Sequence, residues 1–219
     1  MSFNIARTDK KRVVIVGGGF GGLKLANELH KSGFQIILID KNNYHQFPPL
    51  IYQVASSGLE PSSISFPFRK LFNGYKDIHF RMAEARQVYP EKHILQTSIG
   101  KIDYDYLILA AGTTSNFFGN RRIETEAMPM KTLSEAMGLR NALLSNLERS
   151  ITCATDQERR ELLNIVIVGG GATGVEIAGA IAEMKRYVIS KDNPEKDTRN
   201  LHNFLIETGN RPLACLAAQ

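Results

Sequence analysis

The sequence predicts an α/β fold built from two copies of one strand–turn–helix unit, and two observations support this prediction. A β-branched strand, a glycine-rich turn and a helical pattern follow one another from residue 13, and the same order returns 152 residues later. The composition, 43% hydrophobic and 22% charged over 219 residues with 18 glycines, is that of an ordinary globular protein of one or two domains.

The first copy begins with the run VVIV at residues 13–16, which is typical of a buried strand. The turn that follows, residues 17–22, reads GGGFGG. Leu23, Ala26 and Leu29 then recur at helical spacing. These residues predict a strand that enters a tight turn and continues as a helix.

The second copy repeats each part: IVIV at residues 165–168, GGGATG at residues 169–174, then Ile177, Ala178 and Ile181. One such glycine motif is a weak signal, and a tight turn without a ligand is the alternative for either copy alone. Each copy here follows an apolar strand and opens a helix, which is the context that predicts a dinucleotide site. The pair predicts two Rossmann-like dinucleotide-binding units, the second incomplete.

The glycines in each turn have separate tasks. The first allows the tight turn, the third lets the backbone approach a pyrophosphate, and the last lets the helix pack close to the strand. The N–H groups and positive end of the helix then face the phosphates. The residues concerned are Gly17, Gly19 and Gly22 in the first copy and Gly169, Gly171 and Gly174 in the second.

An acid after the second strand of such a unit accepts hydrogen bonds from a ribose. Asp40 ends the apolar segment 35–40, 23 residues after Gly17. In the second copy Glu207 follows the predicted strand 201–206, whereas the rival Asp192 precedes a polar loop. We therefore favour Glu207, and an acid rather than an arginine there favours NAD over NADP.

The segments between the copies predict further elements. Residues 78–82, 88–89 and 94–97 are expected to form an antiparallel meander. Residues 104–113 form an apolar strand that ends in small residues, which permit close approach to a ligand. A capping box at Thr132 starts a helix to about residue 151. The charged run 156–161 is expected to be a solvated face, and a domain boundary is expected near residue 160.

Charge and cysteine content exclude several function classes. The net charge of +5 comes without a nucleic-acid-binding motif or a clustered basic face, so we expect no nucleic-acid partner. Cys153 and Cys215 form no C-x-x-C pair, which leaves no ligands for a zinc cluster and no dithiol centre; no metal site is expected. No apolar stretch reaches the roughly 18 to 20 residues that span a bilayer.

The segment NNYHQFPPLIYQVA at residues 42–55 and the segment VGGGATGVE at residues 168–176 are more specific than the glycines. With them, the chain resembles the pyridine nucleotide-disulfide oxidoreductase superfamily, and within it the type II NADH:quinone oxidoreductases. The resemblance runs from about residue 11 to about residue 213. It implies an FAD-binding domain over residues 1–160 and the start of an NADH-binding domain over residues 161–219.

The resemblance also implies roles for individual residues, and it assigns no catalytic side chain. At FAD it places Gly17, Gly19, Phe20, Gly21 and Gly22 on the pyrophosphate, Asp40 and Lys41 at the ribose, Ala85 near the adenine, and Gln53, Ala111 and Gly112 along the rest of the cofactor. At NADH it places Gly169, Gly171, Thr173 and Gly174 on the phosphates, Glu207 at the ribose, and Glu176 near the nicotinamide end.

The implied activity is that of an FAD-dependent NADH dehydrogenase, which passes hydride from NADH to the flavin and electrons to a quinone. The resemblance also implies a cytoplasmic protein that is peripheral on the inner face of the membrane, and it is compatible with a homodimer. Members of this family run to roughly 400 residues, the size of about two domains. We therefore expect this chain alone to bind FAD weakly and to oxidise NADH poorly; the alternatives are a non-catalytic nucleotide-binding fragment and another FAD/NAD-dependent reductase.

Overall fold

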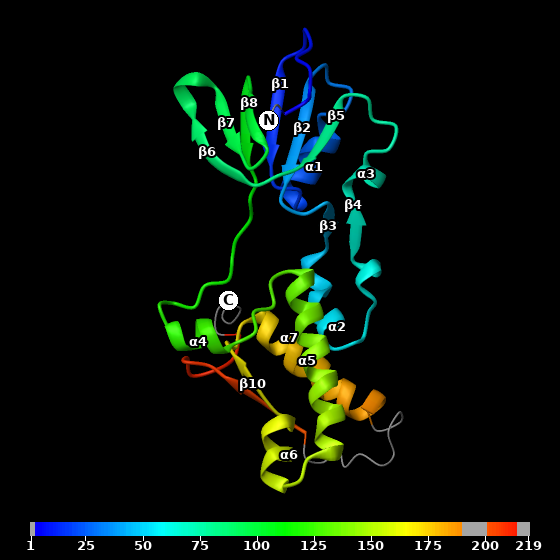
Figure 1. The fold of residues 1–219 in the computed structure, drawn as a ribbon, viewed down its shortest axis with the longest axis vertical. Coiled ribbons are helices and arrows are strands. Elements are labelled where there is room, and N and C mark those ends of the chain that lie inside the picture. The colour runs from blue at the N-terminus through cyan, green and yellow to red at the C-terminus, as the bar shows by residue number, and fades with distance from the viewer. Residues whose placement is uncertain (1–2, 190–200, 214–219) are drawn as a thin grey trace. The chain divides into compact units, whose positions relative to one another are not determined.

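The computed structural model describes residues 3–189 and 201–213 (Figure 1). Its internal contacts divide the chain into two compact units. Unit 1 comprises residues 1–46 and 65–114, and unit 2 comprises residues 47–64 and 115–219. The α/β class with a Rossmann-like strand–turn–helix in each unit is confirmed. The functional boundary near residue 160 stays a prediction.

The centre of unit 1 is a four-stranded parallel sheet in the order β5-β2-β1-β9. Its elements are β1 (Arg12–Val16), α1 (Phe20–Glu28), β2 (Gln35–Asp40), β5 (Ile78–Met82) and β9 (Tyr106–Leu109). Val16 is in register with Ile39, so the turn after β1 and Asp40, the last residue of β2, lie at the same edge of the sheet.

The prediction that residues 78–82 belong to an antiparallel meander was wrong. These residues form β5, which pairs in parallel with β2 in the register Ile36 to Ile78. The physical reason is burial: Ile78 and Phe80 pack in one apolar cluster with Ile36 and Leu38. The short apolar run alone did not reveal which strand it would join.

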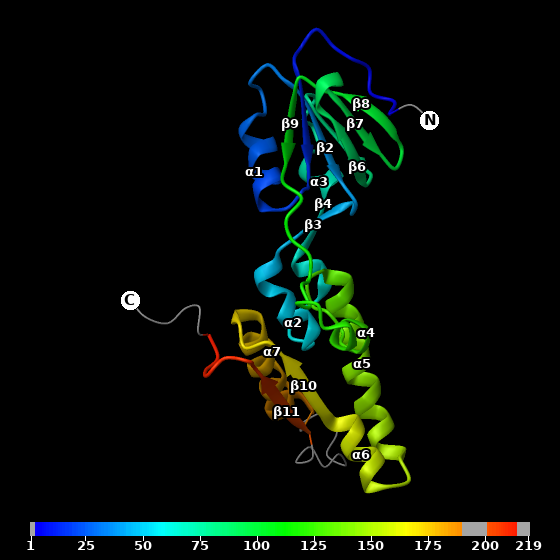
Figure 2. The same cartoon turned by 90° about the vertical axis from the view of Figure 1, so that its left-hand side faces the viewer.

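The meander exists, but it consists of β6 (Ala85–Tyr89), β7 (Ile94–Thr97) and β8 (Gly100–Asp103). It lies across the sheet from α1 (Figure 2). On the meander side, the apolar cluster contains sheet residues Val14, Val16, Ile37 and Ile39 together with Ala83, Leu95, Ile102 and Tyr104. Both faces of this parallel sheet are therefore covered, as such sheets require.

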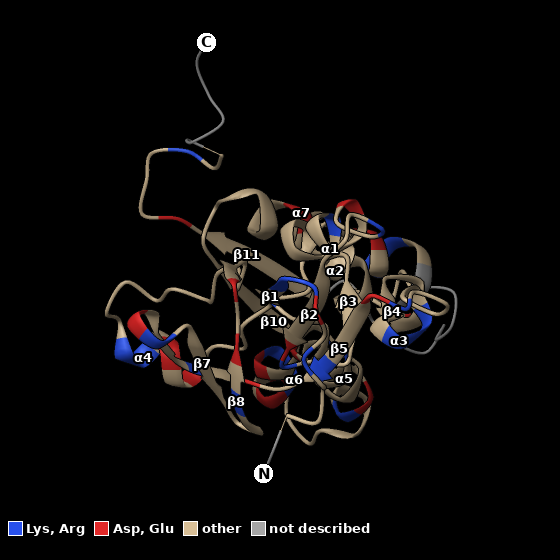
Figure 3. Ribbon diagram, turned by 90° about the horizontal axis from the view of Figure 1, so that it is seen from above, with Lys and Arg blue, Asp and Glu red and all other residues tan. Residues whose placement is uncertain are grey.

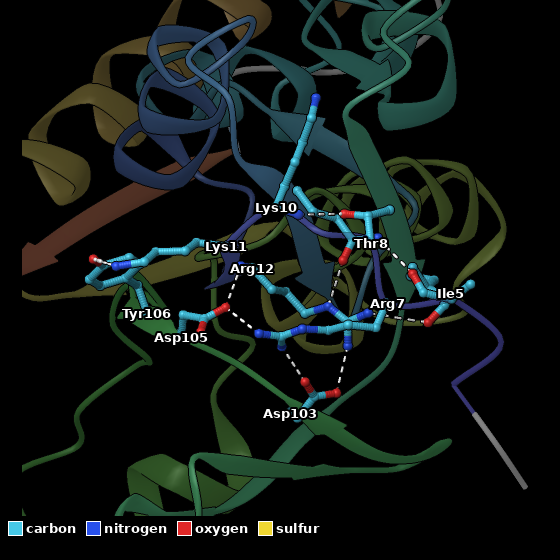
Figure 4. Close-up of polar contacts among 11 residues, drawn as sticks. Ile5, Arg7, Thr8, Lys10, Lys11, Arg12, Asp103, Asp105 and Tyr106 are labelled. Atoms are coloured by element: carbon cyan, nitrogen blue, oxygen red, sulfur yellow. Dashed lines mark hydrogen bonds and ion pairs between the residues drawn. The ribbon is translucent and has the colours of Figure 1, made fainter.

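The start of β1 is held by a buried arginine, Arg12 (Figure 4). The Arg12 guanidinium donates to Gln35 Oε1 at 2.8 Å and to Asp103 Oδ1 at 2.6 Å, and Arg7 also pairs with Asp103. Burial lowers the pKa of Arg12, and Asp103 opposes that shift. This cluster connects β1 and β2 to the end of β8, at the opposite end of β1 from the glycine turn.

A two-stranded ribbon completes unit 1. It consists of β3 (Tyr44–Gln46) and β4 (Ser65–Pro67), paired antiparallel so that His45 faces Phe66, and it leads into α3 (Phe68–Leu71). Phe68 is fully buried against the glycine turn and the β5 side of the sheet. Three short 3-10 turns each begin at a proline: η3 (Pro90–Lys92) in unit 1, and η1 (Pro48–Leu50) and η2 (Pro61–Ser63) in unit 2.

Unit 2 contains mostly helices around a two-stranded parallel sheet. Its elements are α2 (Ile51–Ala55), α4 (Arg121–Glu126), α5 (Leu133–Thr152), α6 (Asp156–Leu163), β10 (Asn164–Val168), α7 (Ala172–Glu183), the π-helical η4 (Met184–Ile189) and β11 (His202–Ile206). The predicted capping box at Thr132 starts α5. Among the described residues, none of the helices combines the length and apolar character needed to cross a bilayer.

The charged run 156–161 is a helix rather than only a solvated segment. A second capping box starts α6: the Thr155 hydroxyl accepts from the Glu158 N–H, and the Glu158 carboxylate accepts from the Thr155 N–H. Leu163 at its end is buried. The missed signal was the pattern Thr-x-x-Glu, the same one that predicted the start of α5.

Candidate functional site

In the first turn, two glycines are required by the protein itself. Gly17 has φ +101°, and its N–H donates to the Ile39 carbonyl at 2.7 Å. A Cβ at Gly17 would lie 2.2 Å from the Ala110 carbonyl oxygen, and one at Gly22 would lie 1.8 Å from the Gly17 carbonyl oxygen. These contacts bring β1, β9 and the start of α1 together without side chains between them.

The middle glycine, Gly18, is held on three sides. Its N–H donates to Asp40 Oδ2 at 2.6 Å, and its carbonyl oxygen is 2.8 Å from Nδ1 of the buried His45. A Cβ at Gly18 would lie 2.1 Å from Phe68 Cζ. Sequence reasoning missed His45 and Phe68, although His45 lies inside the segment that carried the resemblance.

The remaining glycines of this turn, Gly19 and Gly21, face open space. A Cβ at either would meet no atom of the chain within 4 Å. Nothing in the protein therefore excludes a side chain there, whereas a phosphate lying against the start of α1 would. The first turn fits a pyrophosphate, and Phe20 is exposed beside it.

The second turn repeats this geometry. Gly169 has φ +108°, its N–H donates to the Ile206 carbonyl at 2.8 Å, and a Cβ at Gly174 would lie 1.8 Å from the Gly169 carbonyl oxygen. Gly171 faces open space like Gly19. Thr173 is exposed in the first turn of α7. The second turn therefore offers the same cradle as the first.

Glu207 occupies the position of Asp40. Val168 is in register with Ile206, as Val16 is with Ile39, and Glu207 Oε2 accepts from the Gly170 N–H at 2.6 Å. Oε1 accepts from the N–H groups of Thr208 and Gly209. These backbone donors, Gly170 first, lower the pKa of Glu207 to about 2. The rival acid, Asp192, lies outside the described residues.

The other predicted residues fall in both units. In unit 1, Lys41 is exposed after Asp40, Ala85 is half-buried at the start of β6, and Ala111 and Gly112 are exposed after β9. Ala111 lies beside Gly17, because its Cα is 3.1 Å from the position of a Cβ there.

Gln53 belongs to α2 in unit 2, where its carbonyl accepts from Gly58 and Leu59. Glu176 is exposed on α7.

A hollow of about 360 Å³ lies elsewhere in unit 1, beside Arg12 and Asp103 and under the N-terminal segment. The Arg12 guanidinium already donates to Gln35, Asp103 and the Ile5 carbonyl, so we assign this hollow no ligand. Among the residues with described positions, no three His, Cys, Asp or Glu side chains are grouped as metal ligands.

Comparisons with known proteins agree with this geometry. Residues 11–218 match the model of the family described as Pyridine nucleotide-disulphide oxidoreductase. The chain is 36% identical over 185 residues to Type II NADH:quinone oxidoreductase NdhA of Mycobacterium tuberculosis, covering 83% of this chain and 39% of that protein. It is 32% identical to External alternative NAD(P)H-ubiquinone oxidoreductase B2, mitochondrial, of Arabidopsis thaliana, covering 83% of this chain and 33% of that one.

Among solved structures, NDH2 from Plasmodium falciparum in complex with NADH matches with a TM-score of 0.87 and 26% identity. The match covers 94% of this chain and 43% of that one. The predicted resemblance to type II NADH:quinone oxidoreductases is confirmed. The chain spans about two fifths of the length of NdhA and of NDH2.

Proposed function

The chain belongs to the pyridine nucleotide-disulphide oxidoreductase family, and on that premise we propose that it carries the two nucleotide sites of an FAD-dependent NADH dehydrogenase. One observation carries the proposal: both glycine turns are closed by an acid after the second strand, each through a 2.6 Å bond to the middle glycine. Gly19 and Gly171 leave equivalent open cradles at the helix starts.

We assign FAD to the first turn. Its pyrophosphate would lie against the backbone of Gly17, Gly19, Phe20, Gly21 and Gly22, with Asp40 and Lys41 at the ribose. Ala85 would lie near the adenine, and Gln53, Ala111 and Gly112 along the rest of the cofactor. Asp40 already accepts from Gly18 and Asn42, one bond on each oxygen. Each oxygen keeps a lone pair, so the carboxylate can still accept from ribose hydroxyls.

We assign NADH to the second turn, with Gly169, Gly171, Thr173 and Gly174 at its phosphates, Glu207 at its ribose and Glu176 near the nicotinamide end. Glu207 accepts four hydrogen bonds, from Gly170, Gly209 and both the N–H and the hydroxyl of Thr208. A carboxylate offers about four such positions. Oε1 accepts three of these bonds and Oε2 only one, so Oε2 keeps a lone pair that can accept from a ribose hydroxyl.

In the proposed reaction NADH is oxidised and a quinone is reduced, and FAD supplies the redox chemistry between them. The residues assigned above hold the two nucleotides by their phosphates and riboses. No side chain of this chain is assigned to catalysis. Cys153, directly after α5, has its thiol sulfur 3.2 Å from the Ser150 carbonyl oxygen and belongs to unit 2, whereas the first turn belongs to unit 1.

We place the activity at the cytoplasmic face of the membrane, as a peripheral protein, and allow for a homodimer. No nucleic-acid partner is proposed. The ribbon of α4 and of α6 carries both acidic and basic residues (Figure 3). Such mixed surfaces do not form the basic face that nucleic-acid binding uses.

The alternative is a nucleotide-binding module without turnover, and one observation favours it. Among the described residues nothing covers one face of the β10–β11 pair, where Val166, Val168, Phe204 and Ile206 are each about half exposed, whereas parallel sheets normally have both faces covered. Another FAD/NAD-dependent reductase of the same family would share both turns.

The experiment is to titrate the purified chain with FAD and NADH, and then to follow NADH oxidation with a soluble quinone. We expect saturable binding of both nucleotides, weak for FAD, with FAD binding weakened in Gly19→Ala and NADH binding weakened in Gly171→Ala. Binding of both nucleotides without NADH oxidation would select the binding module. No saturable binding of either would contradict the proposed function altogether.

A further inference from the structure

The peptide planes of the first glycine turn are set by two side chains. In a trans peptide the C=O of one residue and the N–H of the next point in opposite directions, and the described chain contains no cis peptide. Asp40 holds the Gly18 N–H, which orients the 17–18 peptide. His45 holds the Gly18 carbonyl, which orients the 18–19 peptide. The Gly19 N–H therefore points away from His45.

His45 is built into this position. It lies in β3 opposite Phe66, it is buried, and its ring meets the Phe20 ring at a centroid distance of 5.7 Å. A carbonyl oxygen only accepts hydrogen bonds, so the 2.8 Å contact requires the proton on Nδ1. The Gly18 α-carbon rests against Phe68, which closes the third side.

The second turn has the same arrangement with a different donor. The Gly170 N–H is held by Glu207, and the Gly170 carbonyl accepts from the backbone N–H of Leu213 at 2.7 Å. Both turns thus fix the middle glycine at both ends. In the second turn the carbonyl is held by main chain, whereas in the first it is held by a side chain.

We propose that His45 is a positioning residue for the FAD pyrophosphate: by binding the Gly18 carbonyl it aims the Gly19 N–H into the open cradle where the phosphate would lie. This rests on the proposed assignment of FAD to the first turn. His45 itself touches no phosphate in this arrangement, and it acts through the 18–19 peptide.

The test compares His45→Phe with His45→Asn in the full chain. Phenylalanine keeps a ring beside Phe20 but has no hydrogen-bond donor. The side-chain amide nitrogen of asparagine occupies nearly the position of Nδ1 and restores a donor to the Gly18 carbonyl. We expect His45→Phe to weaken FAD binding by about 3- to 10-fold, the worth of one hydrogen bond. His45→Asn should recover most of that loss. NADH affinity should stay unchanged in both variants, because Leu213 holds the second turn.

The measurements are flavin fluorescence anisotropy for FAD, a matching NADH titration, and the unfolding midpoint of each chain. A loss of FAD affinity that follows the unfolding midpoint in both variants would indicate only packing and would overturn the proposal. So would native FAD affinity in His45→Phe. No saturable FAD binding by the native chain would instead overturn the proposed function itself.

If His45→Phe does not fold, measurements on the native chain still test the positioning role of His45. Nitrogen-15 NMR of the imidazole should show a proton on Nδ1, and the Gly19 amide should shift on addition of FAD. The positioning role would be overturned by a proton confined to Nε2. It would also be overturned if FAD left the Gly19 amide chemical shift unchanged while it changed those of other amides in the turn.

Discussion

Gly18 and Gly19 are neighbours in the first turn, but different atoms would exclude a side chain at the two positions. At Gly18 the obstacle is the Phe68 ring, which belongs to the protein. At Gly19 the chain leaves open space, so the obstacle would be a ligand. Substitutions at these neighbouring positions should therefore separate folding from nucleotide binding.

Gly18→Ala should lower the free energy of unfolding by about 1–3 kcal/mol, because the added methyl overlaps the Phe68 ring in a packed core. Gly19→Ala should change it by less than about 0.5 kcal/mol, since φ is −69° and nothing lies within 4 Å. FAD binding should be weakened in Gly19→Ala despite its native stability. Denaturant unfolding and a flavin titration measure the two effects, and equal stability loss at both positions would contradict this assignment.

The pKa of Glu207, lowered by its backbone donors from the ordinary value of 4.5 to about 2, predicts a pH dependence of stability. A carboxylate with a lowered folded-state pKa stabilises the fold above its unfolded pKa. That contribution should be lost as the pH falls from about 4.5 to about 2. In Glu207→Gln the stability of the second turn should therefore depend less on pH in this window.

The measurement is amide exchange at Gly170 across that pH range in the native chain and in Glu207→Gln. Glu183→Gln, at the exposed end of α7, is the matched control and should behave as the native chain does. Parallel profiles for native and Glu207→Gln chains would refute the pKa assignment.

At the scale of elements, the two parallel sheets differ in how their faces are covered. Val14 and Val166 are equivalent in the repeat, yet Val14 is 0% exposed beneath the meander and Val166 is 56% exposed. Ile37 and Phe204 stand opposite them in register and are 0% and 49% exposed. A bare apolar face on a parallel sheet is a self-association hazard.

The same substitution should therefore have opposite consequences in the two units. Val14→Lys buries an unpaired charge and should lower the free energy of unfolding by more than about 3 kcal/mol. Val166→Lys should leave stability nearly unchanged and reduce self-association, which light scattering at increasing concentration would detect. Similar stability losses in both variants would mean that the β10–β11 face is covered in solution.

The capping box of α5 provides a second test at this scale. The Thr132 hydroxyl accepts from the Glu135 N–H, and the Glu135 carboxylate accepts from the Thr132 N–H at 2.8 Å. Thr132→Ala should cost about 1 kcal/mol of stability. Ser134→Ala, within the first turn but outside the cap, is the control. The prediction fails if both variants unfold at the same denaturant concentration.

At the scale of the whole molecule, the two turns lie in different compact units. A ligand that binds only the folded form protects the site that it binds. FAD should therefore slow amide exchange in residues 17–22, and NADH should slow it in residues 169–174. Hydrogen-exchange mass spectrometry with each nucleotide alone checks this assignment. Protection of both turns by one nucleotide would contradict the division of labour.

Local pattern was enough to predict much of the site. The turns, the helices that they open and the acids Asp40 and Glu207 follow from short-range periodicity and from the spacing between strand and acid. The same reasoning misplaced β5 and missed β8. A strand of four or five residues indicates burial, and its partner depends on how distant segments meet.

The sequence alone determined the repeated strand–turn–helix and the acid after each second strand, because the residues that specify them are close in the chain. Only the tertiary structure decided which contacts surround the middle glycines and which sheet face is covered. His45 and Phe68 reach Gly18 across 27 and 50 residues, and Leu95 and Ile102 cover Val14 from a separate meander. Contacts between distant segments depend on packing in three dimensions, which local periodicity does not contain.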